Sequence, residues 1–208
     1  MIKAVIFDVD GVLLDSFEAN LEFYRNLMAA AGYAPPTHQE FPKIFHLSMW
    51  DAIKHITSLD SEEEIRKIWE MGRSRKIKYP THLLTTPPHT EETIELLSKK
   101  YSLGIVTSRI RESVYEAPAL SKLQKYFQTV VAYQDTDNHK PHPEPLFLAC
   151  ERLQVKPQQA IYVGDVENDI TAGKAAGMKV IIYSEKRFER ADKCTKNFRN
   201  LPSIIYSL

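Results

Sequence analysis

Residues 2–16 read Ile2-Lys3-Ala4-Val5-Ile6-Phe7-Asp8-Val9-Asp10-Gly11-Val12-Leu13-Leu14-Asp15-Ser16. The apolar run over residues 4–7 has the length and β-branched content of a buried parallel strand, and it stops at Asp8 and Asp10. Ligands of open α/β sheets bind outside this carboxyl end of the strands. Neighbouring carboxylates repel each other unless a cation or a shared proton relieves them, and Mg²⁺ suits carboxylate and carbonyl ligands. The run therefore indicates a metal site, although an ordinary acidic turn has the same composition.

The composition limits the class of protein. The 208 residues allow one large domain or a core with a smaller companion. Lys plus Arg equals Asp plus Glu at 27 each, so the net charge indicates no nucleic-acid and no membrane partner. Cys150 and Cys194 lack the spacing of a disulfide framework or a zinc site, which suits a reducing compartment. No apolar run approaches the length of a membrane span, and we expect a cytoplasmic protein.

The segment after the first strand has helical periodicity and no convincing strand. Asp15 or Ser16 can cap a helix with Glu18 completing a capping box, and Gly32 ends that helix. Ser48 can cap a second helix, and Asp60 or Ser61 can open a third. The helices are predicted at about residues 17–31, 49–56 and 62–79. We therefore expect residues 15–85 to form an all-helical insertion.

Strands and helices alternate in the rest of the chain. Strands are predicted at 102–106, 127–132, 160–163 and 179–183, with a weaker one at 195–198. Helices are predicted at 90–100, 144–153 and 167–176. This alternation is typical of a doubly wound parallel α/β sheet with right-handed crossovers. Residues 1–14 and 86–208 are expected to form that core.

The predicted strands end in polar residues of particular kinds. Thr107 and Ser108 follow the second strand, Lys140 follows the third, and Asp165 and Asp169 follow the fourth. Each has a simpler explanation as a helix cap, a surface lysine or turn chemistry. If the strands are neighbours, all would meet in one crevice, where a metal, a dianionic oxygen group and an attacking carboxylate would satisfy the set.

This ordered combination resembles the haloacid dehalogenase-like superfamily, specifically its phosphatase branch, phosphoglycolate phosphatase-like, with an α-helical cap on a Rossmann-like core. The four matching motifs are Asp8-Val9-Asp10-Gly11-Val12-Leu13-Leu14-Asp15-Ser16, Val106-Thr107-Ser108, Lys140-Pro141-His142-Pro143-Glu144-Pro145, and Val163-Gly164-Asp165-Val166-Glu167-Asn168-Asp169-Ile170. The resemblance covers nearly the whole core in the right order and is weak over the cap.

The resemblance implies a Mg²⁺-dependent phosphatase that acts on a small phosphorylated metabolite. By it, Asp8 would be the nucleophile that forms an aspartyl-phosphate, and Asp10 the general acid and base. Lys140 would be catalytic and would bind phosphate together with Thr107 and Ser108. The metal would be held by Asp8, the Asp10 backbone carbonyl and Asp165, with Asp169 supporting the metal site or orienting Lys140.

Substrate contacts are harder to assign from the sequence. Phe45-His46-Leu47-Ser48 occupies the cap region where relatives often have a Gly-rich turn, so His46 and Ser48 are candidate contacts with the leaving group. Arg109 follows the second motif and is a further candidate, although a solvated helix start is the simpler interpretation.

Two other functions stay open at this point. Phosphosugar mutases of this fold tend to carry an acid directly before the metal-binding aspartate, where this chain has Gly164, which favours hydrolysis. A non-catalytic phosphate-responsive module, such as a receiver domain, also combines acids, a hydroxyl and a lysine. Receivers are much shorter and lack a helical insertion, so this alternative is less favoured.

Overall fold

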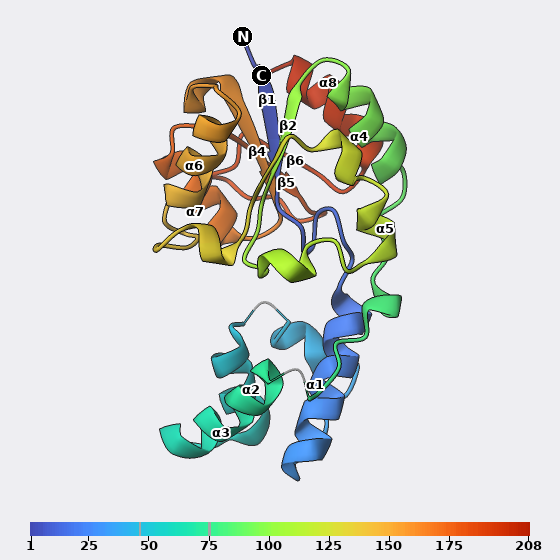
Figure 1. Cartoon of the computed structure of the whole chain (residues 1–208), viewed down its shortest axis with the longest axis vertical. Coiled ribbons are helices and arrows are strands. Elements are labelled where there is room, and N and C mark those ends of the chain that lie inside the picture. The colour runs from blue at the N-terminus through green and yellow to red at the C-terminus, as the bar shows by residue number, and fades with distance from the viewer. Residues whose placement is uncertain (46, 75) are drawn as a thin grey trace. The chain divides into compact units, whose positions relative to one another are not determined.

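The computed structural model describes residues 1–45, 47–74 and 76–208, and the chain divides into two compact units (Figure 1). Met1–Asp15 and Thr85–Leu208 form one, called here the α/β unit, and Ser16–Leu84 form the other, the helical unit. The chain passes between them twice, at Asp15 and at Thr85. These two residues pair as an antiparallel bridge, with Asp15 N donating to Thr85 O at 2.8 Å and Thr85 N to Asp15 O at 3.3 Å.

The α/β unit is built on a parallel sheet of six described strands in the order β3-β2-β1-β4-β5-β6. The strands are β1 Ala4–Phe7, β2 Ser102–Val106, β3 Thr129–Val131, β4 Ala160–Gly164, β5 Lys179–Tyr183 and β6 Lys193–Thr195. β1 lies between β2 and β4, and all four of its residues are buried because helices cover both faces of the sheet. The predicted doubly wound parallel sheet is confirmed.

Helices cover the two faces of this sheet (Figure 1). They are α4 Thr90–Ser98, α5 Pro118–Ser121, α6 Glu144–Arg152, α7 Glu167–Ala175 and α8 Leu201–Tyr206. α6 and α7 lie on one face, α4 and α8 on the other. Under α6 and α7 a core cluster joins Ala4, Ile6 and Tyr162 of the central strands to Leu146 and Ala172. Short 3-10 helices connect these elements: η3 Arg111–Ser113, η4 Gln124–Tyr126, η5 Tyr133–Asp135, η6 Pro157–Gln159 and η7 Phe198–Asn200.

The last strand differs from its predicted position. β6 ends at Thr195, and the residues after it turn into η7, so the strand predicted at 195–198 is wrong beyond its first residue. The Asn197 side chain accepts a hydrogen bond from Arg199 N at 3.0 Å, which caps the turn. Phe198 is then fully buried against Tyr183. Its apolar character comes from core packing rather than from strand pairing.

The helical unit contains α1 Phe17–Ala31, α2 Met49–Thr57 and α3 Glu62–Arg73, with η1 Phe41–Lys43 and η2 Thr81–Leu83. Gly32 ends α1 with φ of +81°, and the hydroxyls of Ser48 and Ser61 accept hydrogen bonds from the first turns of α2 and α3, as predicted. An aromatic-rich core, which includes Phe23, Phe41 and Ile53, holds these helices together.

Two predictions in this unit are wrong. The capping box of α1 does not form: the buried Ser16 hydroxyl has no hydrogen-bond partner among the described residues, and Glu18 instead contacts His38 at 2.9 Å. α3 ends at Arg73 rather than near Tyr79. The Ser74 hydroxyl donates to Met71 O at 2.7 Å, a local bond that competes with continuation of the helix.

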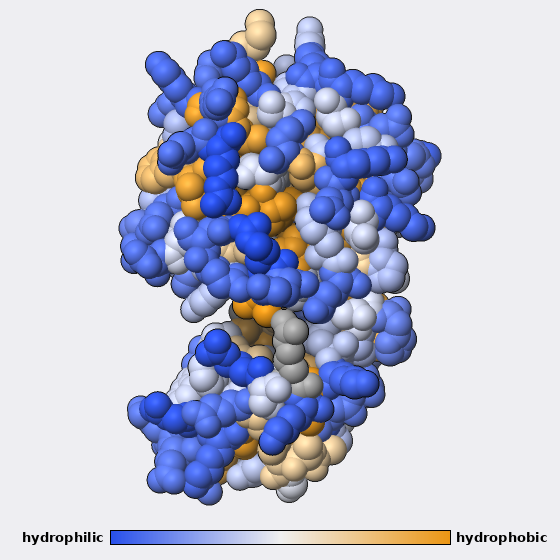
Figure 2. Space-filling model, in the orientation of Figure 1, coloured by the Kyte–Doolittle hydropathy of each residue, from blue (hydrophilic) through white to orange (hydrophobic). Residues whose placement is uncertain are grey.

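Hydrophilic residues predominate on the surface of both units in the face that Figure 2 shows. Charged residues make up 26% of the chain, while the long apolar side chains of the strands are buried. In the described part of the chain, no helix is both long and apolar enough to cross a membrane.

Candidate active site

The site lies at the carboxyl ends of the three central strands. Asp8 directly follows β1, Thr107 follows β2, and Asp165 follows β4. β2 and β4 both pair with β1, so these residues are brought to one edge of the sheet. Lys140 comes from the segment between β3 and α6 and reaches the same point, where its ammonium contacts Asp8. The convergence expected from neighbouring strands is therefore present.

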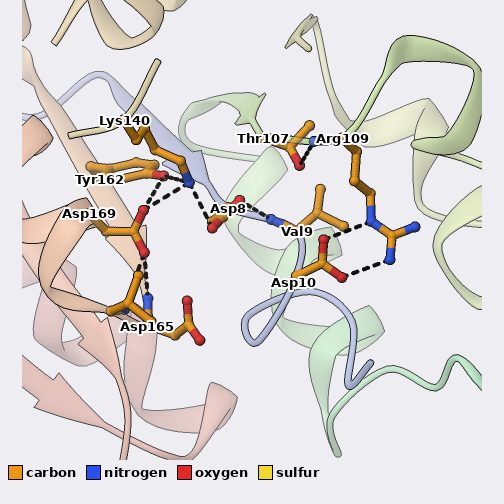
Figure 3. A network of polar contacts seen from close by, with 10 residues as sticks. Asp8, Val9, Asp10, Thr107, Arg109, Lys140, Tyr162, Asp165 and Asp169 are labelled. Atoms are coloured by element: carbon orange, nitrogen blue, oxygen red, sulfur yellow. Dashed lines mark hydrogen bonds and ion pairs between the residues drawn. The ribbon is translucent and has the colours of Figure 1, made fainter. Parts of the chain in front are cut away.

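The Lys140 ammonium joins three polar side chains of the site (Figure 3). Its Nζ is 2.7 Å from Asp8 Oδ2, 2.8 Å from Asp169 Oδ1 and 2.9 Å from the Tyr162 hydroxyl. An ammonium has three N–H donors, so each has an acceptor. The side chain is 7% exposed, and burial of such a charge is tolerated because it is paired and fully hydrogen-bonded.

Asp169 accepts four hydrogen bonds in the first turn of α7. Oδ1 accepts from Lys140 Nζ and from the Tyr162 hydroxyl at 3.0 Å, while Oδ2 accepts from the backbone N–H groups of Asp165 and Val166 at 3.0 and 3.2 Å. A carboxylate offers about four lone-pair positions, so this one is saturated. Asp169 was predicted either to support the metal site or to orient Lys140, and these contacts fit the second role.

Asp8 and Asp165 have more acceptor capacity left. Asp8 Oδ1 accepts one bond from Val9 N at 2.7 Å, and Oδ2 faces Lys140. Asp165 lies over Gly11, where a Cβ would come within 2.0 Å of Asp165 Oδ2, and Gly11 itself has φ of +75°. Glycine is therefore required at position 11 both for the turn and for the approach of Asp165.

Carboxylate oxygens of Asp8, Asp165 and Asp169 all lie within 4.8 Å of one another. Carboxylate oxygens are the ligands that Mg²⁺ prefers. A cation bound among these three carboxylates would also relieve their mutual repulsion. Because Asp169 is saturated, Asp8 and Asp165 are the side chains that fit the ion best. The Asp10 carboxylate points away from this cluster toward Arg109 (Figure 3), so Asp10 could contribute only its backbone carbonyl.

Burial and like charges shift the pKa values of these acids. Burial, with the Asp169 and Asp10 carboxylates, raises the pKa of Asp8 to about 7 even though Lys140 opposes the shift. Burial and the Asp8 carboxylate raise the pKa of Asp165 to about 8. Burial disfavours the Asp169 carboxylate as well, but Lys140 and the backbone donors outweigh it and lower its pKa. Asp169 and Asp8 likewise outweigh burial and raise the pKa of Lys140.

These shifts predict how the metal-free protein responds to pH. The folded-state pKa values of Asp8 and Asp165 lie above the ordinary 3.8, so the folded protein binds protons more tightly than the unfolded chain. The resulting stability is complete below about pH 4 and is lost as the pH rises through about 7 to 8. We expect the free energy of unfolding in EDTA, measured with urea, to fall between about pH 4 and 8, by up to about 1.4 kcal/mol per pH unit for each of the two carboxyl groups. Asp165→Asn should flatten this fall, and a flat wild-type profile would contradict the prediction.

Asp10 forms a two-point ion pair with Arg109. Arg109 Nε donates to Oδ2 and Nη2 donates to Oδ1, both at 2.7 Å, and a third donor of the guanidinium reaches Ser113 O at 3.3 Å. The Arg109 side chain is only 12% exposed, so its interpretation as a solvated helix start is wrong. Its fork geometry matches the carboxylate, which fixes the plane of Asp10.

The other predicted residues have different surroundings. The buried Thr107 hydroxyl accepts from Arg109 N at 3.1 Å, which leaves its O–H to donate, whereas Ser108 is exposed. Ser48 caps α2 by accepting from Asp51 N at 3.2 Å, and its predicted contact with the leaving group stays a prediction. His46 lies outside the described residues.

Tyr162 belongs to the network but was missed by the sequence analysis. It occupies a strand whose other residues are small or apolar, so its ring fits the pattern of a core position. The signal in the sequence was a tyrosine hydroxyl three residues before Asp165, on a predicted strand whose other residues are small or apolar.

Comparison with known proteins places this site in a family. Residues 5–183 match the family described as haloacid dehalogenase-like hydrolase. A pyrophosphatase PpaX of Bacillus cereus (strain B4264) is 34% identical over 188 residues, which cover 88% of this chain and 83% of the relative. A pyrophosphatase PpaX of Bacillus pumilus is 30% identical over 98% of this chain and 96% of the relative. A crystal structure of a HAD-superfamily hydrolase, subfamily IA, variant 1, from Geobacter sulfurreducens is 26% identical, with a TM-score of 0.80 over 98% of this chain and 96% of that one.

The chain therefore belongs to the haloacid dehalogenase-like hydrolases. Within this family it is a phosphatase, which confirms the resemblance to the haloacid dehalogenase-like superfamily found in the four motifs. Hydrolases of this family generally use Mg²⁺, and the acidic cluster of this chain fits that ion. The interpretation as a non-catalytic module is not supported.

Proposed function

We propose that the protein is a Mg²⁺-dependent phosphatase that hydrolyses a small phosphorylated compound through an aspartyl-phosphate on Asp8. The observation that carries the proposal is the position of the Asp8 carboxylate at the end of the central strand, where it contacts the Lys140 ammonium at 2.7 Å and has an oxygen within 4.8 Å of an Asp165 oxygen. An oxygen suited to attack, a fixed positive charge and a candidate cation position would thereby lie side by side, which supports the proposal. Phosphoryl transfer requires this combination, because its catalysis consists mainly of positioning and charge neutralisation.

In the first step, an oxygen of Asp8 attacks phosphorus, the bond to the leaving oxygen breaks, and Asp10 gives that oxygen a proton. Lys140 and the Thr107 hydroxyl neutralise charge on the phosphoryl oxygens, and the exposed backbone at Ser108 adds donors. Mg²⁺, held by Asp8, Asp165 and the Asp10 carbonyl, would supply further positive charge to the same oxygens.

In the second step, Asp10 accepts a proton from a water molecule, whose oxygen attacks phosphorus of the aspartyl-phosphate. The bond between phosphorus and the Asp8 oxygen breaks, so phosphate leaves and the Asp8 carboxylate is restored. Asp10 must release at least one contact with Arg109 during this cycle, because both of its carboxylate oxygens are occupied in the structure.

Replacement of Arg109 should lower the rate of turnover. In Arg109→Gln, Asp10 loses the two guanidinium donors that orient it, and we expect kcat to fall about tenfold with little change in KM. Arg111→Gln is the matched control, since Arg111 pairs with Asp135 in the neighbouring turn and is 49% exposed. Steady-state kinetics of the two variants should differ; equal kcat values would show that Arg109 does not orient Asp10.

Pyrophosphate is the first substrate to test, because both PpaX relatives carry the name pyrophosphatase. We propose that the helical unit serves as the cap that selects the leaving group, with His46 and Ser48 as its predicted contacts. An unchanged substrate profile in His46→Ala would count against the role of His46.

The test is phosphate release from a panel of phosphorylated metabolites and pyrophosphate, with and without Mg²⁺. Turnover that depends on Mg²⁺ is expected for at least one compound, and the ranking of the panel identifies the leaving group. Metal-independent turnover, or none with any compound, would refute the proposal.

Phosphosugar mutase activity is the alternative within the fold. A Cβ at Gly164 would lie 2.3 Å from Asp169 Cβ, so an acid before Asp165 is not compatible with Asp169 in its present place. This geometry supports hydrolysis. Incubation with sugar phosphates separates the two functions, because a mutase produces an isomer where a phosphatase releases phosphate.

A further inference from the structure

Tyr162 connects the apolar core to the polar network. The residue lies in the middle of β4 and is fully buried, with its ring in the cluster that contains Ala4 and Ile6. Its hydroxyl extends past this cluster to Lys140 Nζ at 2.9 Å and Asp169 Oδ1 at 3.0 Å (Figure 3). Packing in the sheet thus fixes the position of the Tyr162 ring, and the rigid ring fixes the position of its hydroxyl.

The direction of both hydrogen bonds follows from the partners. An ammonium can only donate, so the Tyr162 oxygen accepts from Lys140. The ionised Asp169 can only accept, so the Tyr162 O–H donates to Oδ1. One hydroxyl therefore satisfies a donor of Lys140 and an acceptor position of Asp169 at the same time.

These bonds constrain the direction in which Lys140 points. With one N–H on Tyr162 and one on Asp169, the third is directed at Asp8 Oδ2 at 2.7 Å. Rotation of the ammonium would break a hydrogen bond to a buried group, which is costly. The positive charge is consequently held beside the oxygen atoms where phosphorus is attacked.

The same bonds constrain Asp169. Its four acceptor positions are filled, two of them at Oδ1 by Lys140 and Tyr162. Without the tyrosine O–H, Asp169 would have a free acceptor position while one of its oxygens lies within 4.8 Å of an oxygen of Asp8 and of Asp165. A cation at that cluster could then attract Asp169 away from Lys140.

We propose that Tyr162 is a positioning residue, whose hydroxyl keeps Lys140 directed at Asp8 and keeps Asp169 bound to Lys140 rather than to the metal ion. The inference rests on the proposed phosphatase mechanism. It assigns the metal ion to Asp8 and Asp165 and gives the tyrosine hydroxyl an effect on both rate and metal affinity.

The test is Tyr162→Phe, which removes the hydroxyl and keeps the ring in the core. Tyr183→Phe is the matched control, because Tyr183 is also a buried strand tyrosine, 2% exposed, on neighbouring β5. Steady-state kinetics and calorimetric titration of metal-free protein with Mg²⁺ are measured on the wild type and both variants. Thermal melts verify that each variant is folded.

In Tyr162→Phe we expect kcat to fall about tenfold, with KM changed by less than about twofold, because a hydrogen bond to a charged group is lost. Mg²⁺ should bind about threefold or more tightly, because Asp169 becomes available as a ligand. Tyr183→Phe should change neither quantity. A purely structural role of Tyr162 would instead leave Mg²⁺ affinity unchanged or weaken it.

Unchanged kcat or unchanged Mg²⁺ affinity in a folded Tyr162→Phe protein would overturn the inference. If the wild type itself shows no Mg²⁺-dependent turnover, the proposed function fails, and the calorimetric comparison still tests the assignment of Asp169. If Tyr162→Phe does not fold, an NMR measurement on the wild type supplies the test. The Lys140 ammonium should give a proton–nitrogen correlation signal that is protected from solvent exchange, and comparison with Lys140→Met identifies that signal. Absence of the signal would overturn the inference.

Discussion

Asp8→Asn is expected to reduce kcat by about four orders of magnitude or more on every phosphorylated substrate, because the nucleophilic oxygen is replaced by an amide. Steady-state phosphate release measures this loss. Intact mass analysis of acid-quenched protein should detect a phosphoryl adduct in the wild type during turnover and none in the variant. Glu151→Gln, which changes an exposed carboxylate on α6, is the control and should keep full activity.

The Asp8→Asn protein should stay folded despite losing a buried contact with Lys140. Oxygens of Asp8, Asp165 and Asp169 lie within 4.8 Å of one another beside a single ammonium, and burial raises the pKa of Asp8 and of Asp165. Removal of one negative charge relieves this repulsion, while Lys140 keeps its contacts with Asp169 and Tyr162. Thermal melts should therefore show no loss of stability in metal-free buffer. Turnover that persists in the folded variant would exclude Asp8 as the nucleophile.

Lys140→Met is expected to destabilise the protein by about 3–5 kcal/mol as well as to abolish turnover. The substitution leaves the Asp169 carboxylate, whose side chain is 0% exposed, without its cation. Urea denaturation of the metal-free proteins measures the loss. Lys174→Met is the control, since Lys174 pairs with Asp192 at a partly exposed position and should contribute less than about 1 kcal/mol.

A double variant separates the lost charge pair from lost packing. In Lys140→Met with Asp169→Asn, the unpaired buried charge is gone, and we expect much of the stability to return while activity stays absent. If the double variant is as unstable as the sum of the two single variants, the Lys140–Asp169 pair does not account for the destabilisation.

Much of the fold could be predicted because the strands are short, fully buried apolar runs. β1, β2 and β5 have the predicted bounds, and Gly32 ends α1 where a left-handed residue is needed. Errors occurred where a local hydrogen bond outweighed periodicity. The Ser74 hydroxyl bond to Met71 O accompanies the early end of α3, and the turn at Asn197 replaces a strand.

The residue types of the candidate site could also be predicted, but not their pairing. Arg109 and Asp10 are 99 positions apart, and their two-point contact depends on how the turns after β1 and β2 are oriented. The saturation of Asp169 depends on backbone N–H directions in the first turn of α7. Tyr162 was missed because a buried aromatic residue in a strand has the same sequence signature whether or not its hydroxyl reaches a polar site.

The paired bridge between Asp15 and Thr85 has a consequence for the evolution of the protein. Because both connections between the units are joined at this bridge, residues 16–84 form an insertion whose two ends meet at one place on the α/β unit. The entropic cost of bringing the ends of such an insertion together rises only slowly with its length. Insertions, deletions or wholesale exchange of this segment would therefore leave the sheet and the carboxylates of the candidate active site intact, and under the proposed cap role such exchanges would change substrate preference without rebuilding the site.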